Sequence, residues 1–131
     1  MQTEITAHTT TARYKTTLSN DRHSILADEP LDLEGTDLGF TPTELLSGAL
    51  ASCTSITLRM YADRKAWPLT DIKVHVSFER DAKTSTTAVS RRIELFGDLD
   101  DEQRARLLTI ANSCPVHRIL SGQINIDSHL A

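Results

Sequence analysis

Aromatic residues are scarce in this sequence, at 5% of the chain, and long apolar runs are missing. With so few aromatic side chains, a core has to be built from leucine, isoleucine, valine and alanine. No stretch reaches the roughly 18 apolar residues that a membrane-spanning helix needs, and the N-terminus does not resemble a signal peptide. We therefore expect a cytoplasmic protein without a membrane partner.

Positive charge is also in short supply, because 14 lysines and arginines stand against 18 acidic residues, for a net charge of −4. Proteins that bind nucleic acids usually carry a basic excess, so we expect no nucleic-acid partner. The 131 residues contain no repeat and no low-complexity linker. They fit a single domain over residues 1–131.

Cysteine occurs only twice, as Cys53 and Cys114. In a reducing compartment a structural disulfide is uncommon, and cysteine pairs there are more often catalytic, redox-sensing or metal-binding. The setting of each thiol therefore matters.

The pattern of the chain predicts an α+β domain in the order βββ-α-ββ-α-α-β. Three short segments in the first 27 residues are compatible with strands, and an acidic segment at 28–40 is typical of a surface loop. Alternating segments at 72–78 and 89–95 predict antiparallel strands, and Ile124 with Ile126 predicts a last strand. Strands and helices do not alternate regularly, so a parallel sheet is not expected.

A long helix is predicted to begin at Thr41-Pro42-Thr43-Glu44, which combines an N-cap threonine, a proline at the first helical position and a capping-box acid. Apolar residues at three- and four-residue steps from Leu46 to Met60 indicate that it is largely buried, and it ends near Lys65. Cys53 lies about three turns inside it. The simplest interpretation of such a cysteine is a small core residue.

A second helix is predicted from Asp100, the N-cap, with Gln103 three residues on. It ends before Cys114-Pro115, because a residue that precedes proline disfavours helical geometry, and a third helix begins there. At this place free backbone N–H groups favour a thiolate on Cys114, although a plain linker residue fits equally well.

His117 follows Cys114 by one turn and fits a hydrogen-bond partner, a zinc ligand or a solvated histidine. Two ligands do not make a zinc site, and no second close pair is present, so we expect no metal and no other cofactor. The arginines are interpreted by default as solvated: Arg22, Arg59, Arg64, Arg91, Arg92, Arg104, Arg106 and Arg118.

Two motifs in this order resemble the OsmC/Ohr family. The first is Thr41-Pro42-Thr43-Glu44-Leu45-Leu46 leading to Ala49-Leu50-Ala51-Ser52-Cys53, and the second is Cys114-Pro115-Val116-His117. Residues 60–65 and 101–104 are similar to the general OsmC-like branch. The resemblance covers nearly the whole chain.

This resemblance implies an intertwined homodimer with long central helices packed against antiparallel sheets, and active sites near the subunit interface. It gives Cys53 the place of the peroxidatic cysteine, which attacks an organic hydroperoxide and becomes a sulfenic acid. Cys114 takes the place of the resolving cysteine, and a dithiol such as dihydrolipoamide reduces the resulting disulfide. The chemistry agrees with the residues, because sulfenic acids condense with nearby thiols.

The family peroxidases also use a glutamate and an arginine. Their glutamate stands one position before Glu44, where this chain has Thr43, and Arg22 is the nearest match to their arginine. A buried thiol needs a nearby cation to ionise near neutral pH. We therefore predict Arg22 and Glu44 as further catalytic residues, although Glu44 also has a structural role as the capping acid.

Two other hypotheses remain open at this point. The chain also fits a non-enzymatic member of the same fold that senses redox state or binds a small apolar ligand. It fits, thirdly, a structural or metal-binding protein whose cysteines hold zinc or fill space.

Overall fold

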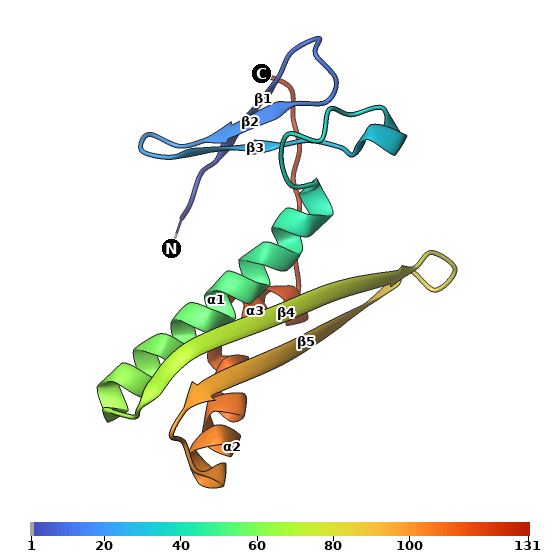
Figure 1. The fold of residues 1–131 in the computed structure, drawn as a ribbon. Helices are drawn as coiled ribbons and strands as arrows, with labels where there is room; N and C mark the ends of the chain where they lie inside the picture. Colours follow the sequence, from blue (N-terminus) through green and yellow to red (C-terminus); the bar gives the residue numbers. More distant parts are fainter. Residues whose placement is uncertain (1) are drawn as a thin grey trace. The chain divides into compact units, whose positions relative to one another are not determined.

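The computed structural model describes residues 2–131, in two compact units that divide after Leu46 (Figure 1). The first unit contains a three-stranded antiparallel sheet in the order β1-β2-β3, with bounds Thr6–Thr9, Thr16–Ser19 and Ser24–Ala27. A short 3-10 helix, Leu31–Leu33, follows in the loop after β3. The strands expected in the first 27 residues are therefore confirmed.

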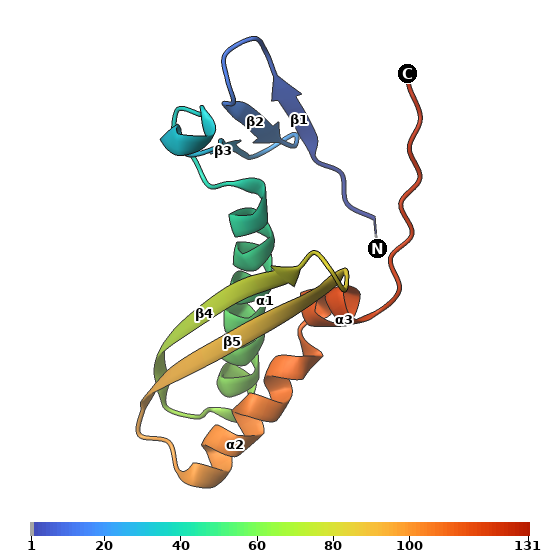
Figure 2. The same cartoon turned by 90° about the vertical axis from the view of Figure 1, so that its right-hand side faces the viewer.

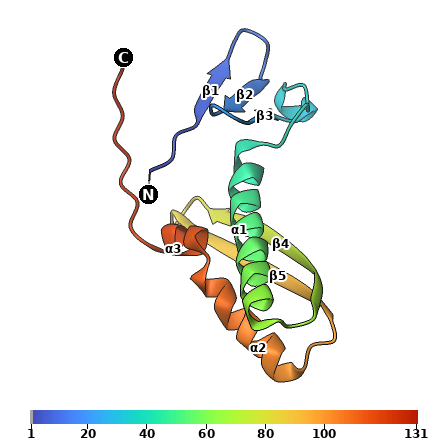
Figure 3. The same cartoon turned by 90° about the vertical axis from the view of Figure 1, so that its left-hand side faces the viewer.

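The second unit contains an antiparallel hairpin and three helices. Its elements are α1 (Pro42–Lys65, whose first residues belong to the first unit), β4 (Leu69–Asp81), β5 (Thr86–Gly97), α2 (Asp101–Ile110), a 3-10 turn (Ala111–Ser113) and α3 (Pro115–Ser121). Seen from two sides, α1 and α2 lie on the same face of the β4–β5 ribbon (Figures 2 and 3). The α+β class is confirmed. Within residues 2–131, no helix is both long and apolar enough to cross a membrane.

The hairpin is longer than the sequence suggested. The prediction of a last strand at Ile124 and Ile126 is wrong. Pairing between β4 and β5 runs from Leu69 opposite Gly97 to Asp81 opposite Thr86. Beyond α3 the chain has no regular secondary structure. Ile124 and Ile126 alternate as a strand would, but they are 55% and 87% exposed. Alternation alone does not make a strand, because a strand also needs a neighbour to pair with.

Both predicted helix starts are confirmed as reciprocal capping boxes. The backbone N–H of Glu44 donates to Thr41 Oγ1 at 3.2 Å, and the Thr41 N–H donates to Glu44 Oε1 at 2.9 Å. At α2 the Gln103 N–H donates to Asp100 Oδ1 at 2.7 Å, and the Asp100 N–H donates to Gln103 Oε1 at 2.9 Å. Each box satisfies two N–H groups that a helix start would otherwise leave without a partner.

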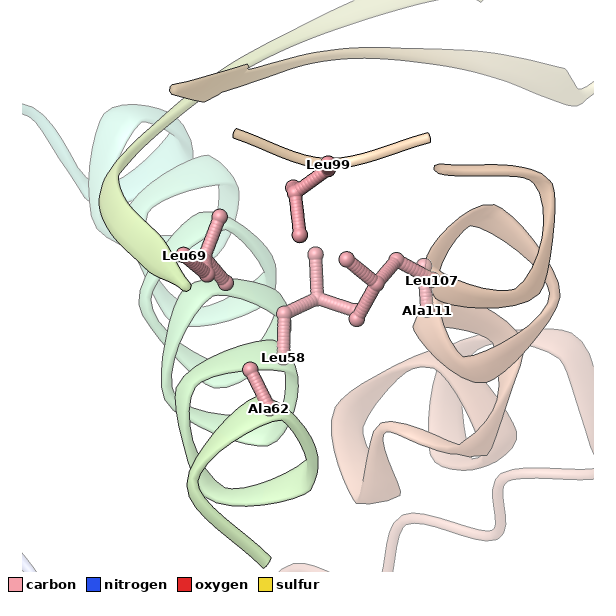
Figure 4. Packing of buried hydrophobic residues seen from close by; sticks show 6 residues of the cluster. All are labelled: Leu58, Ala62, Leu69, Leu99, Leu107 and Ala111. Carbon is pink, nitrogen blue, oxygen red and sulfur yellow. The ribbon is translucent and has the colours of Figure 1, made fainter. Parts of the chain in front are cut away.

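The core of the second unit lies between α1 and α2 (Figure 4). Leu58 from α1 and Leu107 from α2 point toward one another, and both are 0% exposed. The rest of the cluster closes around them: Ala62, Leu69, Leu99 and Ala111. Leucine and alanine supply this core, as the scarcity of aromatic residues requires.

The buried stripe of α1 differs from the expected one. Every fourth residue is buried, namely Leu50, Thr54, Leu58 and Ala62. Ile56 and Met60, by contrast, are 54% and 58% exposed. The expectation of a largely buried helix is therefore wrong for the single chain, because only the side of α1 that faces β4, β5 and α2 is covered.

The acidic loop of the first unit is organised by one carboxylate. Asp28 is 2% exposed. It accepts the hydroxyl of Thr36 and the backbone N–H groups of Tyr14, Glu29, Thr36 and Leu38. The Thr36 hydroxyl, together with these N–H groups, outweighs burial and holds the pKa of Asp28 well below its usual range. Gly35 is buried in the same loop, where a Cβ atom would collide with the Glu29 carbonyl.

Leu107→Ala should lower the free energy of unfolding by about 2–5 kcal/mol, because it leaves a cavity against Leu58. Urea denaturation measures the change. Leu108→Ala is the matched control on the same helix, since Leu108 is 63% exposed, and its effect should stay within about 0.5 kcal/mol. Equal losses in the two variants would contradict the assignment of the core.

Candidate functional site

The structure brings Cys53 and Cys114 together in the second unit. Cys53 lies on α1 and is half-buried, whereas Cys114 lies between the 3-10 turn and α3 and is 0% exposed. Both are free thiols, and they lie close enough for each to shift the pKa of the other. A mid-helix cysteine and a cysteine before a proline thus form one site.

Local backbone geometry aims several donors at the sulfurs. Cys114 has φ −57° and ψ 127°, outside the helical region, and Pro115 begins α3 directly after it. The backbone N–H of Val116 lowers the pKa of both thiols, and that of His117 lowers the pKa of Cys114. These N–H groups lie in the first turn of α3, where a helix has no backbone acceptor for them.

The two thiols differ in acidity. Burial raises the pKa of Cys53, and the hydrogen bond with Cys114 raises it further, against the opposing effect of the Val116 N–H. Burial also disfavours the thiolate of Cys114. Hydrogen bonds from Cys53, from the backbone N–H groups of His117 and Val116, and from the Thr54 hydroxyl nevertheless hold the pKa of Cys114 below its ordinary value.

Arg91 on β5 is the residue that the sequence interpretation missed. It is half-buried rather than solvated. Its Nη1 donates to Thr54 Oγ1 at 3.0 Å and to the carbonyl of Ala111 at 3.3 Å, and its Nη2 donates to Asn112 Oδ1 at 2.9 Å. One guanidinium therefore joins the residue after Cys53 to the segment that leads into Cys114.

Two other arginines were also wrongly interpreted as solvated. Arg59 Nη2 donates to the carbonyl of Leu69 at 2.6 Å, and Arg104 Nη1 donates to that of Leu95 at 3.0 Å. Both therefore hold backbone carbonyls of the hairpin.

Arg91 also lines a pocket of about 170 Å³. It is lined by Leu50, Val89, Arg91, His117, Leu120 and Ser121. Apolar walls with one guanidinium and one imidazole suit a small ligand with a polar end.

The other two predicted site residues lie in the first unit. Arg22 occupies the exposed turn between β2 and β3, where its backbone N–H donates to Asn20 Oδ1 at 2.9 Å. Glu44 caps the start of α1. Their catalytic roles stay predictions. Within residues 2–131, no three histidine, cysteine or acidic side chains gather as ligands for a metal ion.

The sequence matches one known protein family over most of its length. A family model described as OsmC-like protein matches residues 35–129. This chain belongs to the OsmC-like protein family. The matched region of this OsmC-like protein includes Glu44, Cys53, Arg91 and Cys114, whereas Arg22 lies outside it.

Solved structures share the fold at low sequence identity. An OsmC-like protein from Mycoplasma pneumoniae is 20% identical with a TM-score of 0.79, over 93% of this chain and 89% of that one. An organic hydroperoxide resistance protein OsmC from Legionella pneumophila is 19% identical with a TM-score of 0.68, over 93% and 90%. The organic hydroperoxide resistance protein OhrB of Bacillus subtilis is 20% identical with a TM-score of 0.63, over 93% and 92%. No curated protein matches the sequence.

Proposed function

We propose that this OsmC-like protein is a thiol peroxidase that reduces organic hydroperoxides, including those of fatty acids, in defence against oxidative stress. The observation that carries the proposal is the proximity of two free thiols, Cys53 and Cys114, each of which shifts the pKa of the other. The names of the Legionella and Bacillus proteins, which refer to organic hydroperoxide resistance, point the same way.

The reaction has three steps. Cys53, as a thiolate, attacks the terminal oxygen of the hydroperoxide, the O–O bond breaks, and the departing alkoxide takes a proton to become an alcohol. The sulfur of Cys53 is thereby oxidised to a sulfenic acid. The sulfur of Cys114 then attacks Cys53, a disulfide forms, and the expelled hydroxide leaves as water. An external dithiol reduces the disulfide and is itself oxidised.

A lipoyl-type dithiol is the proposed reductant, because an intramolecular dithiol reverses a disulfide by two successive exchanges. The proposed compartment is the cytoplasm, where thiols are kept reduced between turnovers. The half-buried Cys53 is the more accessible thiol, which suits its proposed role as the one that meets peroxide.

Arg22 and Glu44 are proposed as further catalytic residues. A guanidinium stays charged at all relevant pH values and donates several hydrogen bonds, so it suits the stabilisation of a thiolate or of the departing oxygen. Because burial raises the pKa of Cys53, a cation is needed there. Glu44 is proposed to orient that cation in addition to its capping role.

A homodimer is proposed as the working form. Ile56 and Met60 leave an apolar face of α1 exposed in the single chain, at 54% and 58% of their surfaces. Pairing of two such helices would remove this apolar surface from water and stabilise both chains.

Cys53→Ser should abolish the consumption of cumene hydroperoxide in the presence of dihydrolipoamide, because it removes the nucleophile. Cys114→Ser should lose turnover but leave a sulfenic acid on Cys53 that dimedone traps. Mass spectrometry identifies the adduct, and Ser52→Ala is the control that should keep turnover. Wild-type turnover in both cysteine variants would rule the proposal out.

Arg22→Met should raise the pKa of Cys53 by about one unit, because the thiolate loses its cation. The pH dependence of Cys53 alkylation in a Cys114→Ser background measures the shift. Arg13→Met provides a second exposed arginine of the first unit as the control. An unchanged profile for Arg22→Met would mean that another cation serves Cys53.

Ile56→Asp and Met60→Asp should convert the dimer to a monomer, because each places an unpaired carboxylate in the proposed interface. Sedimentation at micromolar concentration measures the mass. Leu108→Asp, on the exposed side of α2, should leave the dimer intact. A wild-type protein that is folded and monomeric under these conditions would contradict the proposal.

A further inference from the structure

Arg91 lies on the core-facing side of the hairpin, although it is charged. Ile93 and Leu95 follow it on β5 at two-residue steps and pack against the core cluster. Neighbouring Arg92 points the other way, with a side chain that is 66% exposed and an ion pair to Glu94 at 3.7 Å. A half-buried guanidinium needs specific acceptors, and the acceptors of Arg91 lie on the two segments that carry the thiols.

Thr54 connects this guanidinium to Cys114. Its side chain is 0% exposed, and its hydroxyl accepts from Arg91 Nη1 at 3.0 Å while donating to the Leu50 carbonyl at 2.7 Å. The same hydroxyl is close enough to Cys114 to lower the pKa of its thiol. A hydroxyl has one proton to give. When Cys114 becomes a thiolate, that proton has a charged acceptor available in place of a neutral carbonyl.

We infer that Arg91 is a positioning residue of the thiol pair: through Thr54 and the end of α2 it holds Cys114 beside Cys53 and favours negative charge on the Cys114 sulfur. The donation from Arg91 polarises the Thr54 hydroxyl and strengthens it as a donor to the thiolate. The carbonyl of Leu50 keeps the backbone N–H of residue 54, its partner in the helix. The hydroxyl can therefore turn to sulfur without leaving an acceptor unsatisfied.

Other groups around Cys114 also favour its thiolate, but among those that act on it none is a cation. Cys53 on α1 acts through its thiol, and His117 on α3 acts through its backbone N–H rather than through its imidazole. Arg91 on β5 carries a permanent positive charge and is hydrogen-bonded to Thr54, which itself lowers the pKa of Cys114. Its other bonds, to the Ala111 carbonyl and to Asn112, fix the segment before Cys114.

Cys114 then has a role before it attacks the sulfenic acid and forms the disulfide, and this role rests on the proposed peroxidase function. A Cys114 thiolate can take the proton from the Cys53 thiol, so that Cys53 attacks the peroxide as a thiolate. The departing alkoxide then takes that proton back from Cys114. Cys114 is again a thiolate when it attacks the sulfenic acid on Cys53, and the hydroxide that it expels becomes water by taking up a proton from the buffer, which balances the proton that Cys114 released when it ionised.

The test is a titration of the reduced protein without peroxide, read from the Cβ chemical shifts of isotopically labelled cysteines. Arg91→Met and Thr54→Val should each raise the pKa of Cys114 by about one unit, which leaves about tenfold less thiolate at a pH below it. Thr54→Ser retains the hydroxyl and should titrate close to wild type. Arg92→Met, the adjacent arginine on the opposite face of β5, should change nothing.

Thr54→Val preserves the shape of a buried side chain, so it decides the matter if Arg91→Met does not fold. An unchanged Cys114 titration in folded Thr54→Val would overturn the relay through the hydroxyl. Equal shifts in Arg91→Met and Arg92→Met would overturn the specific role of Arg91, since they would reflect general charge. Because no peroxide is present, these outcomes are independent of whether the protein proves to be a peroxidase.

Discussion

The contact between Leu58 and Leu107 is the constraint on which the second unit depends. It joins α1 to α2 in a core that contains no aromatic residue among its fully buried members. Cys53 lies little more than one turn before Leu58 on α1, and Cys114 lies two turns after Leu107 along the chain. Close packing of these two leucines therefore also sets the separation of the two sulfurs. A shift of one helix along the other would separate the two sulfurs. The stability of the unit and the geometry of the thiol pair therefore depend on the same contact.

Two identical functional groups acquire different properties at this site because the donors around them are unequal. Cys53 is embedded in a helix whose backbone N–H groups are occupied by helical hydrogen bonds. Cys114 follows a helix end and precedes a proline, so the N–H groups beyond it are free to point at sulfur. The asymmetry originates in Pro115, which separates α2 from α3. A pair of thiols on one regular helix would lack this difference.

The sequence predicted those features that depend on neighbouring residues. Both capping boxes, the hairpin and the break at Cys114 follow from local rules and were found in the structure. The buried stripe of α1 was misplaced, because apolar residues occur on more than one side of the helix and only tertiary packing selects which side is covered. The Ile124–Ile126 strand failed for a related reason, since pairing depends on a partner strand.

Arg91 was missed although the signal was present. It alternates in register with Val89, Ile93 and Leu95, which indicates an inward position on β5. Its charge nevertheless led to its interpretation as a solvated residue. The pairing of Cys53 with Cys114 followed from the resemblance of the two motifs rather than from the spacing. An arginine at an inward strand position is better interpreted as a buried residue with specific partners, because burial of its charge requires acceptors nearby.

The Asp28 carboxylate has a consequence for the whole first unit. By accepting N–H groups from Tyr14 before it and Leu38 after it, it closes a loop of chain much as a covalent cross-link would. Secreted domains often use a disulfide for this purpose, which constrains the unfolded chain and occupies two cysteines. A carboxylate achieves the closure without oxidation chemistry. Both thiols of the protein are free, and the closure of this loop uses neither of them.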